Sequence, residues 1–371
     1  MKLIILKNNL KEGLSAVERA TTDSSNLPIL KNILCKTDAK TIRLSATNLE
    51  IGVHKFVSGK VIEEGEITIP FAPFYNIISN TDSERVSLET EDNNLYIKTD
   101  NYQAKIQGMN SEEFPIIPSI TNQDSFIEIN SSVLKESLES TVYAAHISEI
   151  RPEISGVLFD FQTTILKFVA TDSFRLAEKI LNNRQFKTTY EKGFQAIIPL
   201  KTIQEIIRTF SNDVLLKIII DQNQILIKTE GQELISRLIS GQYPDYEQII
   251  PKETETEILL ERDKLLNAIR LVSSFSGRVN DVKMKAEEGG KTLEVYSASQ
   301  GLGENNYLIP VKITGPEINE ISFNWRYILD GIKAIKSKDL LLGINSENKP
   351  ALMRAPDEMT YRYIVMPIKA T

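Results

Sequence analysis

Cysteine and histidine are nearly absent from this chain of 371 residues. Because Cys35 is the only cysteine, no intrachain disulfide can form, which fits a reducing cytosol and predicts a cytoplasmic protein. The two histidines, His54 and His146, lie far apart and have no cysteine pattern beside them, so no zinc site is expected. Long apolar runs are also missing, since none approaches the ~20 residues of a membrane helix. The apolar stretch at 1–6 is too short for a signal peptide and predicts an opening strand.

The sequence also lacks the sets of residues that catalysis requires. It contains no nucleophile with a base and an orienting partner, and no carboxylate cluster that would hold magnesium for phosphoryl transfer. Gly290-Lys-Thr292 resembles the end of a phosphate loop, but Lys285 occupies the position of the first glycine and a strand pattern follows. Gly301-Leu-Gly303 lacks the third glycine of a dinucleotide-binding loop and predicts a bulge in an edge strand. No catalytic residue, metal or cofactor is expected.

The bulk composition is that of a soluble globular protein, with 41% hydrophobic and 25% charged residues. A length of 371 residues suggests two or three domains. The net charge of −7 argues against a protein that binds nucleic acid with its whole surface, although a single face could still do so.

One block of helices and strands occurs three times along the chain. Each block begins with an amphipathic helix, and a second helix follows a strand that ends at Pro70, Pro199 or Asn324. These positions are spaced by 129 and 125 residues, so the period is near 125. The blocks predict three similar α+β domains over 1–122, 123–252 and 253–371, each with antiparallel sheets covered by two helices. In such an array we expect the sheets on one side and the six helices on the other. The apolar stripes of the three first helices are Leu10, Leu14 and Val17; Leu134, Leu138, Thr141, Val142 and Ala145; and Leu265, Leu266, Ile269 and Val272.

Positive charge is concentrated in the expected helices. The six segments 10–20, 73–80, 133–147, 200–212, 264–278 and 325–338 carry a net charge of +6, which leaves −13 for the rest of the chain. This polarity predicts a phosphate-lined partner on the helical side, held through its backbone and hence without sequence preference. The alternative is that lysine and arginine are simply good helix formers.

A ten-residue stretch at 168–177 predicts a β-hairpin with a polar turn. Its strand ends at Thr171-Asp172-Ser173, whose side chains can hydrogen-bond to their own backbone. After the turn, the apolar residues Phe174, Leu176 and Ala177 look exposed and surround the single cation Arg175, which suggests the edge of a groove. Asp172 and Arg175 are expected to form a local ion pair.

Several motifs, taken in order, resemble a known family. They are Leu-Pro-Ile-Leu at 27–30, Val-Ala-Thr-Asp at 169–172 with Arg175 and Leu176, Tyr-Pro-Asp-Tyr at 243–246, and Tyr-Ile-Val-Met-Pro at 363–367. With the three equal blocks, the chain resembles the bacterial DNA polymerase III β subunit, the sliding clamp, over its whole length. The resemblance implies a non-catalytic processivity factor: a head-to-tail homodimeric ring around double-stranded DNA, with the helices of its clamp domains lining the hole and the sheets outside.

The resemblance also implies a pocket between the second and third domains. Short linear peptides of the replicative polymerase α subunit, the clamp loader, other polymerases and repair proteins would bind there. Phe174 stands where a small polar side chain or histidine is common in the family, and Gln248 replaces a frequent arginine, so the peptide preference is expected to differ. The implied pocket residues are Ile154, Thr171, Ser173, Phe174, Arg175, Leu176, Pro244, Ile249, Pro350, Val365, Met366, Pro367 and Ile368.

Two further surfaces follow from the resemblance. Ser24 stands where an arginine can occur, and Pro152-Glu153 replaces a polar-aromatic pair, so direct DNA contacts are expected to be weak. The dimer seam would pair the strand region 102–107 with 300–307, and its strength is expected to come from Ile106, Leu302 and backbone hydrogen bonds. The implied DNA-facing residues are Ser24, Ser148, Arg151, Lys201, Arg270, Arg278 and Lys333. The implied seam residues are Tyr102, Ala104, Lys105, Ile106, Ser273, Ser274, Leu302 and Glu304, of which Lys105 and Glu304 are placed to form an ion pair.

Two alternatives remain open at this level. One is an enzyme with nucleotidyltransferase activity of its own, which would need a metal-binding carboxylate pair. The other is a repeat-built scaffold that binds peptides but never DNA.

Overall fold

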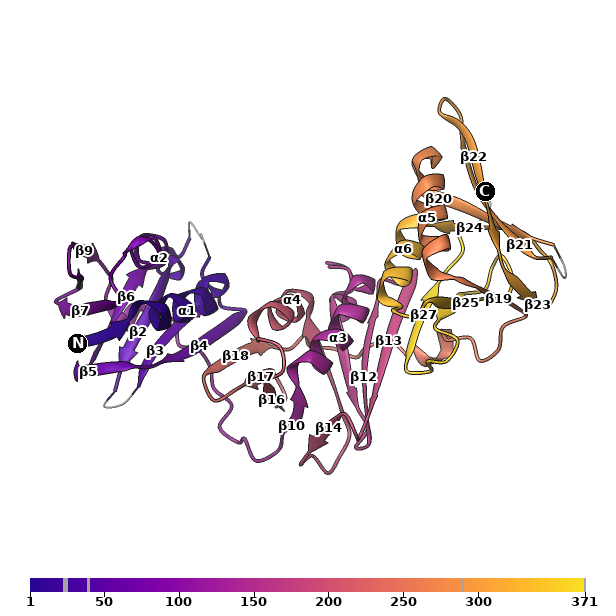
Figure 1. The fold of residues 1–371 in the computed structure, drawn as a ribbon. Coiled ribbons are helices and arrows are strands. Elements are labelled where there is room, and N and C mark those ends of the chain that lie inside the picture. The colour runs from indigo at the N-terminus through magenta and orange to yellow at the C-terminus, as the bar shows by residue number, and fades with distance from the viewer. Residues whose placement is uncertain (23–25, 39–40, 288–289, 370–371) are drawn as a thin grey trace. The chain divides into compact units, whose positions relative to one another are not determined.

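The computed structural model describes residues 1–22, 26–38, 41–287 and 290–369 (Figure 1). Their tertiary contacts group them into two compact units. Unit 1 comprises residues 1–131, 187–190 and 208–238. Unit 2 comprises residues 132–186, 191–207 and the chain from 239 onward.

Unit 1 contains two antiparallel sheets. The smaller sheet has the order β5-β1-β7-β8-β9 and the larger has the order β14-β10-β16-β17-β18-β4-β3-β2-β6. In the larger sheet β18 pairs with β4, with Leu234 opposite Val53, so strands of the first and second repeats form one continuous sheet. The strands of the smaller sheet are β1 (Lys2–Leu6), β5 (Gly59–Glu63), β7 (Arg85–Glu91), β8 (Asn94–Lys98) and β9 (Gln103–Gln107). Those of the larger sheet are β2 (Asn32–Thr37), β3 (Ile42–Thr47), β4 (Ile51–Val57), β6 (Gly65–Pro70), β10 (Ile127–Asn130), β14 (Phe186–Thr188), β16 (Leu215–Ile220), β17 (Gln224–Lys228) and β18 (Gln232–Arg237).

Unit 2 also contains two antiparallel sheets. Their orders are β15-β11-β12-β13-β27-β26-β25-β19-β23 and β22-β21-β20-β24. The pairing of β13 with β27, with Leu176 opposite Ile364, joins the second repeat to the third. The strands of the first sheet are β11 (Gly156–Phe161), β12 (Ile165–Thr171), β13 (Arg175–Asn182), β15 (Phe194–Pro199), β19 (Thr256–Glu261), β23 (Lys312–Thr314), β25 (Asp339–Ile344), β26 (Ala351–Arg354) and β27 (Tyr361–Val365). Those of the second are β20 (Asp281–Ala286), β21 (Thr292–Ser299), β22 (Gly303–Pro310) and β24 (Ile318–Asn324).

The helices follow the predicted repeat. The first helix of each repeat has 11 residues and runs into a three-residue 3₁₀ turn. The second has 10 residues and follows directly on a strand that ends at Pro70, Pro199 or Asn324, and the Asn324 side chain accepts a hydrogen bond from the backbone N–H of Arg326 at 3.0 Å. The helices are α1 (Lys7–Val17), α2 (Phe71–Asn80), α3 (Ser131–Thr141), α4 (Leu200–Thr209), α5 (Arg262–Val272) and α6 (Trp325–Ala334). The 3₁₀ turns are η1 (Glu18–Ala20), η2 (Pro28–Lys31), η3 (Ser111–Glu113), η4 (Val142–Ala144), η5 (Pro152–Ile154), η6 (Glu247–Ile249) and η7 (Ser273–Phe275).

Five helices end earlier than predicted, those of the segments 10–20, 133–147, 200–212, 264–278 and 325–338. In α3 the hydroxyls of Ser140 and Thr141 donate to the Ser137 carbonyl, which favours the tighter 3₁₀ turn that follows. Arg278, Lys336 and Lys338 therefore lie beyond helix ends. The observed helices carry a net charge of +4 rather than +6, so the polarity of charge is real but smaller than predicted.

The cores lie between the sheets and the apolar faces of the helices. The predicted stripes are buried except for Val142 and Leu266, which are half-buried; for example, Leu14, Leu138 and Ile269 are fully buried. Val142 and Ala145 lie beyond the end of α3. Cys35 is buried in β2, and burial raises the pKa of its thiol to about 12. One prediction is wrong at this level. Leu176 and Ala177 are buried rather than exposed, because β13 is covered on both faces.

Candidate functional site

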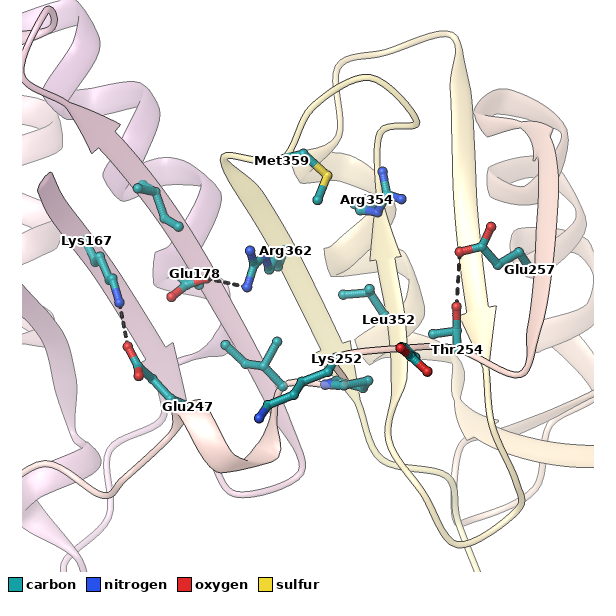
Figure 2. Close-up of a pocket in the computed structure, with 14 residues that line it drawn as sticks. Lys167, Glu178, Glu247, Lys252, Thr254, Glu257, Leu352, Arg354, Met359 and Arg362 are labelled. Carbon is teal, nitrogen blue, oxygen red and sulfur yellow. Dashed lines mark hydrogen bonds and ion pairs between the residues drawn. The ribbon is translucent and has the colours of Figure 1, made fainter.

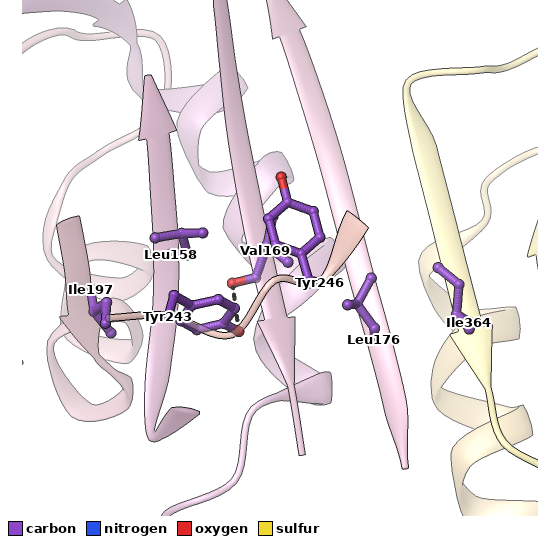
Figure 3. Close-up of a cluster of buried hydrophobic side chains, with 7 residues drawn as sticks. All are labelled: Leu158, Val169, Leu176, Ile197, Tyr243, Tyr246 and Ile364. Carbon is purple, nitrogen blue, oxygen red and sulfur yellow. Dashed lines mark hydrogen bonds between the residues drawn. The ribbon is translucent and has the colours of Figure 1, made fainter. Parts of the chain in front are cut away.

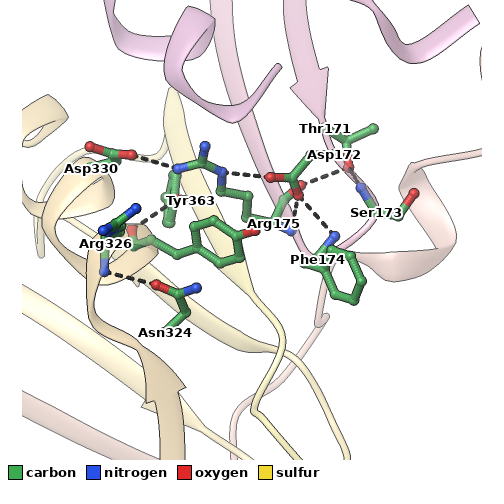
Figure 4. A network of polar contacts seen from close by, with 10 residues as sticks. Thr171, Asp172, Ser173, Phe174, Arg175, Asn324, Arg326, Asp330 and Tyr363 are labelled. Carbon is green, nitrogen blue, oxygen red and sulfur yellow. Dashed lines mark hydrogen bonds and ion pairs between the residues drawn. The ribbon is translucent and has the colours of Figure 1, made fainter. Parts of the chain in front are cut away.

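The turn between β12 and β13 is held by its own polar side chains (Figure 4). The Asp172 carboxylate accepts hydrogen bonds from the backbone N–H groups of Phe174 and Arg175, both at 3.0 Å. The Thr171 hydroxyl donates to the Arg175 carbonyl at 2.7 Å. Ser173 adopts a positive φ of 77°. These bonds fix the turn chemistry that the sequence predicts, and they leave the Phe174 ring pointing outward, 61% exposed.

Arg175 connects this turn to α6. Its Nε lies 2.9 Å from an Asp172 oxygen, which confirms the predicted local ion pair, and its Nη1 lies 2.6 Å from an oxygen of Asp330. The guanidinium also stacks over the Tyr327 ring, 4.3 Å from the centroid. Burial acts to lower the pKa of Arg175. Tyr363, Asp330 and Asp172 act to raise it and together outweigh burial, so the pKa lies above its ordinary value. The Asp330 pair therefore ties the turn to a helix that lies 155 residues away in sequence.

The C-terminal segment lies beside the same turn. Arg175 is opposite Val365 in the β13–β27 pairing, and the Met366 N–H donates to the Phe174 carbonyl at 2.8 Å. The Ile368 N–H donates to the Ser322 carbonyl at 2.8 Å, which fixes the chain after β27. The structure thus brings together two groups of implied pocket residues that lie far apart in sequence. They are Thr171, Ser173, Phe174, Arg175 and Leu176 at the turn, and Val365, Met366, Pro367 and Ile368 in the C-terminal segment.

The pocket residues differ in what they can offer to a ligand. Leu176 and Val365 are almost fully buried, and Ile154 and Thr171 are 4% and 5% exposed, so these four support the site from beneath. Ser173 and Phe174 are exposed. The residues that are half-buried are Arg175, Pro244, Pro350, Met366, Pro367 and Ile368.

The segment at 243–246 is anchored by its two tyrosines (Figure 3). Tyr243 and Tyr246 belong to a buried cluster with Leu158, Val169, Leu176, Ile197 and Ile364. The Tyr243 hydroxyl donates to the Val169 carbonyl at 3.4 Å, and burial raises the pKa of this tyrosine above its ordinary value. This packing positions η6, which presents Ile249 with 40% exposure. Ile249 and Pro350 line one pocket of about 670 Å³.

The implied DNA-facing residues that the structure describes differ in their contacts and exposure. Arg151 bonds to Glu153 at 3.1 Å and to the Ser173 hydroxyl at 3.0 Å, so it lies beside the Phe174 turn, and the Ser148 hydroxyl accepts from its backbone N–H. Lys333 pairs with Asp330 at 3.7 Å. Lys201, Arg270 and Arg278 are exposed, and Ser24 lies outside the described residues.

Both strands of the implied seam are edge strands. In the sheet orders, β9 ends the smaller sheet of unit 1 and β22 ends the smaller sheet of unit 2. Tyr102 is 44% exposed and Leu302 is 64% exposed, whereas Ile106 is only 7% exposed. The expectation that Ile106 supplies the seam's strength is therefore wrong, because this side chain is already buried in its own unit. The other implied seam residues that are exposed are Lys105, Ser274 and Glu304, and those that are half-buried are Ala104 and Ser273.

One exposed apolar residue near β22 is not among the predicted ones. Leu271, at the end of α5, is 57% exposed, and its carbonyl accepts a hydrogen bond from Asn305 of β22 at 3.0 Å. The signal was present in the sequence. Leu271 falls outside the buried stripe of Leu265, Ile269 and Val272, and a large apolar residue off that stripe indicates a second surface to cover.

No helix in the described ranges is long and apolar enough to cross a membrane. The same ranges contain no group of three or more histidine, cysteine, aspartate or glutamate side chains arranged to hold a metal ion.

Three consecutive α+β repeats, joined edge to edge by antiparallel strands, define the chain as a protein of the three-domain clamp class. Three family models match consecutive segments: the N-terminal, central and C-terminal domains of the DNA polymerase III beta subunit, over residues 1–118, 128–245 and 247–369. The chain belongs to the DNA polymerase III β subunit family. It functions as a sliding clamp, which is a non-catalytic accessory subunit of the replicative polymerase.

Curated relatives and solved structures agree over the full length. The chain is 29% identical to the beta sliding clamp of Synechococcus elongatus, over 100% of this chain and 99% of the relative. It is 27% identical to that of Bacillus subtilis, over 100% of both. The crystal structure of the Bacillus subtilis sliding clamp matches with a TM-score of 0.94 and 26% identity, covering 100% of both chains. A Pseudomonas aeruginosa sliding clamp bound to griselimycin matches with a TM-score of 0.93 and 24% identity, again covering 100% of both chains.

Proposed function

We propose that two copies of this chain associate head to tail into a closed ring around double-stranded DNA. The observation that carries this proposal is the pair of free sheet edges, β9 and β22, each with an exposed apolar residue beside it. Unpaired edges promote association, and pairing one with the other in a second copy would extend both sheets. The domain boundaries near 122 and 252 and a cytoplasmic location belong to the same proposal.

The DNA contacts we propose are weak and independent of sequence. Lys201, Arg270, Arg278 and Lys333 supply positive charge from α4, the α5 region and α6. A ring retains DNA by topology, so strong phosphate binding is not needed and would slow sliding.

The proposed peptide pocket is the surface around Phe174, Met366 and Pro367. An exposed ring on a rigid turn offers an anchor for hydrophobic side chains at low entropic cost, since Arg175 and Asp172 already order the turn. The partners we propose are the polymerase α subunit, the clamp loader, other polymerases and repair proteins, each through a short linear motif.

Topological linkage provides the first test. The protein is loaded onto nicked circular DNA by a clamp loader, and the DNA is then linearised. We expect retention on the circle and loss within seconds to minutes after linearisation, because a ring slides off a free end. Retention on linear DNA would contradict the ring and would favour direct binding.

Charge reversal separates the clamp from a peptide-binding scaffold. With glutamate at Lys201, Arg270, Arg278 and Lys333, we expect DNA retention to fall while binding of a polymerase peptide is unchanged. An unaltered retention would exclude these cations from the DNA path. Primer extension by the isolated chain would instead revive the enzyme alternative.

Deletion of residues 366–371 tests the peptide pocket. We expect the variant to remain a dimer by light scattering and to lose polymerase binding, because Met366 and Pro367 lie against the Phe174 turn. Phe174→Ala should weaken binding in the same direction, and Ile62→Ala, at an exposed isoleucine on β5, serves as the matched control. Unchanged binding by the deletion variant would mean that the pocket lies elsewhere.

A further inference from the structure

A second pocket lies in unit 2, apart from the Phe174 turn (Figure 2). It has a volume of about 530 Å³, within the range of small-ligand sites. Its floor is formed by strands β12, β13, β27 and β26, and the segment 250–254 forms one wall. None of the residues that line it belongs to the proposed peptide pocket.

A buried carboxylate in this pocket has an oxygen without a hydrogen-bond donor. Glu178 of β13 is only 2% exposed, and its Oε2 accepts no hydrogen bond. The nearest cation is Arg362 on the neighbouring strand β27, at 3.8 Å, which is an ion pair but too long for a hydrogen bond. A buried acceptor without a donor loses its hydration and gains nothing in return, so native structures rarely retain one without a reason.

Two other cations of the pocket are already engaged. The Lys167 ammonium lies 2.5 Å from Glu247, and the Arg354 guanidinium donates to the carbonyls of Ala355 and Pro356 at 3.2 and 2.8 Å. Neither of these contacts involves Glu178. Lys252 also lines the pocket, but its ammonium gives Glu178 Oε2 no hydrogen bond, so that oxygen can accept one from a donor that enters the pocket.

The apolar walls of the pocket favour a ligand that carries its donor group on an alkyl chain. Ile180, Ile250 and Leu352 line it with partly buried side chains, and Met359, 60% exposed, stands at the rim. Short alkyl groups fit such walls. Burial raises the pKa of Glu178, and Arg362 and Lys167 only partly oppose this effect, as expected for a carboxylate that lacks a cation in contact.

We propose that this pocket binds the cationic head of a ligand, a guanidinium or ammonium group on a short alkyl chain, with one N–H donated to Glu178 Oε2 and the chain packed against Ile250 and Leu352. Two sources share this chemistry: a free alkyl cation, and the arginine or lysine side chain of a protein. The site does not depend on the ring or on the peptide pocket.

Ligand-observed saturation-transfer NMR on the full-length protein tests the proposal. The probes are n-butylguanidinium and the capped tripeptide N-acetyl-Leu-Arg-Leu-amide, with n-butanol as a probe without charge. We expect saturable binding of at least one cationic probe, weakened 10-fold or more by Glu178→Gln, and no Glu178-dependent binding of n-butanol. Tighter binding of the peptide identifies a protein side chain as the source, and binding of butylguanidinium alone identifies a small molecule.

Two further variants keep the test decisive if Glu178→Gln folds poorly. Met359→Trp fills the rim from an exposed position and should also weaken binding 10-fold or more. Glu255→Gln is the matched control, since Glu255 lines the neighbouring pocket, pairs with Lys349 at 3.0 Å and should leave binding unchanged. Absence of saturable binding by both cationic probes, or equal binding by wild type, Glu178→Gln and Met359→Trp, would overturn the proposal.

Discussion

Arg175 is a single side chain that holds two carboxylates from different repeats. Asp172 and Asp330 both depend on it, and the side chains of Arg175 and Asp172 are about nine-tenths buried. Arg175→Ala should therefore lower the free energy of unfolding by about 3 kcal/mol, because the buried Asp172 loses its cation and Asp330 keeps only the half-exposed Lys333. Arg175→Lys should recover only part of this loss, since a lysine ammonium lacks the planar, forked guanidinium that bonds to both carboxylates at once.

Urea unfolding checks this prediction, with Lys333→Ala as the control. Lys333 pairs with the same Asp330 but is half exposed, so its removal should cost well under 1 kcal/mol. Equal effects of Arg175→Ala and Lys333→Ala would show that the network contributes little to stability.

His54 predicts a specific dependence of stability on pH. It lies in β4 with Nδ1 2.8 Å from the Ser45 hydroxyl, and burial, assisted by Arg43, lowers its pKa from 6.5 to about 4. The unfolded chain therefore binds the proton more tightly than the folded protein does. This contribution is fully present above pH 6.5 and is lost as the pH falls toward 4, by about 3 kcal/mol in total.

The variant His54→Gln isolates that contribution. Between pH 7.5 and 4.5, wild type should lose about 2–3 kcal/mol more unfolding free energy than His54→Gln does. The exposed His146 provides the matched control, His146→Gln, which should follow the wild-type curve. Parallel curves for wild type and His54→Gln would contradict the role of this histidine.

Among the helices, α6 contains a glycine that its packing requires. A Cβ on Gly331 would lie 2.5 Å from Cδ1 of the Tyr363 ring, which is buried and bonded through its hydroxyl to the Tyr327 carbonyl. Gly331→Ala should lower the free energy of unfolding by about 1–3 kcal/mol, because the ring cannot move without losing that bond. Gly231→Ala, where a Cβ meets nothing within 4 Å, is the control and should change stability by less than ~0.5 kcal/mol. A neutral Gly331→Ala would mean that α6 shifts freely on β27.

Local patterns predict the elements of this fold well, since each helix has an apolar face to bury and the second helix of each repeat follows a proline or asparagine. They do not predict which distant strands pair. The β4–β18 and β13–β27 pairings depend on positions about 180 residues apart, for which the sequence contains no local signal. For the same reason Leu176 and Ile106 look like surface residues but are buried by strands from elsewhere in their unit.

The sequence predicts one part of the candidate sites and not another. The resemblance of motifs brings together Phe174, Arg175 and Met366, which the structure places side by side. Glu178 gives no such signal, because a Glu-Lys pair in the middle of a strand is typical of a solvent-exposed face. Its importance appears only when β27 and the segment 250–254 cover it.

For the whole molecule, the proposed ring depends on how much apolar surface the two free edges can cover. Ile106 is already buried, so the seam must rely on Leu302, Leu271 and Tyr102, together with the backbone hydrogen bonds of β9 and β22. Lys105 adds little to a cross-seam ion pair, since it is exposed and its ammonium already stands over the Tyr96 ring at 5.6 Å. Variants that test the proposed dimer should therefore disrupt its apolar packing or its strand pairing.

Leu302→Asp and Leu271→Asp should each weaken dimerisation at least 100-fold, because a buried carboxylate would face an apolar seam without a partner. Sedimentation equilibrium from nanomolar to micromolar protein measures this effect. Ile62→Asp is the matched control, since Ile62 is 47% exposed on β5, the opposite edge of the same sheet as β9, and it should leave the dimer intact. Weakening by Ile62→Asp alone would move the seam to that opposite edge. If all three variants dimerise like wild type, the free edges are not where two copies meet.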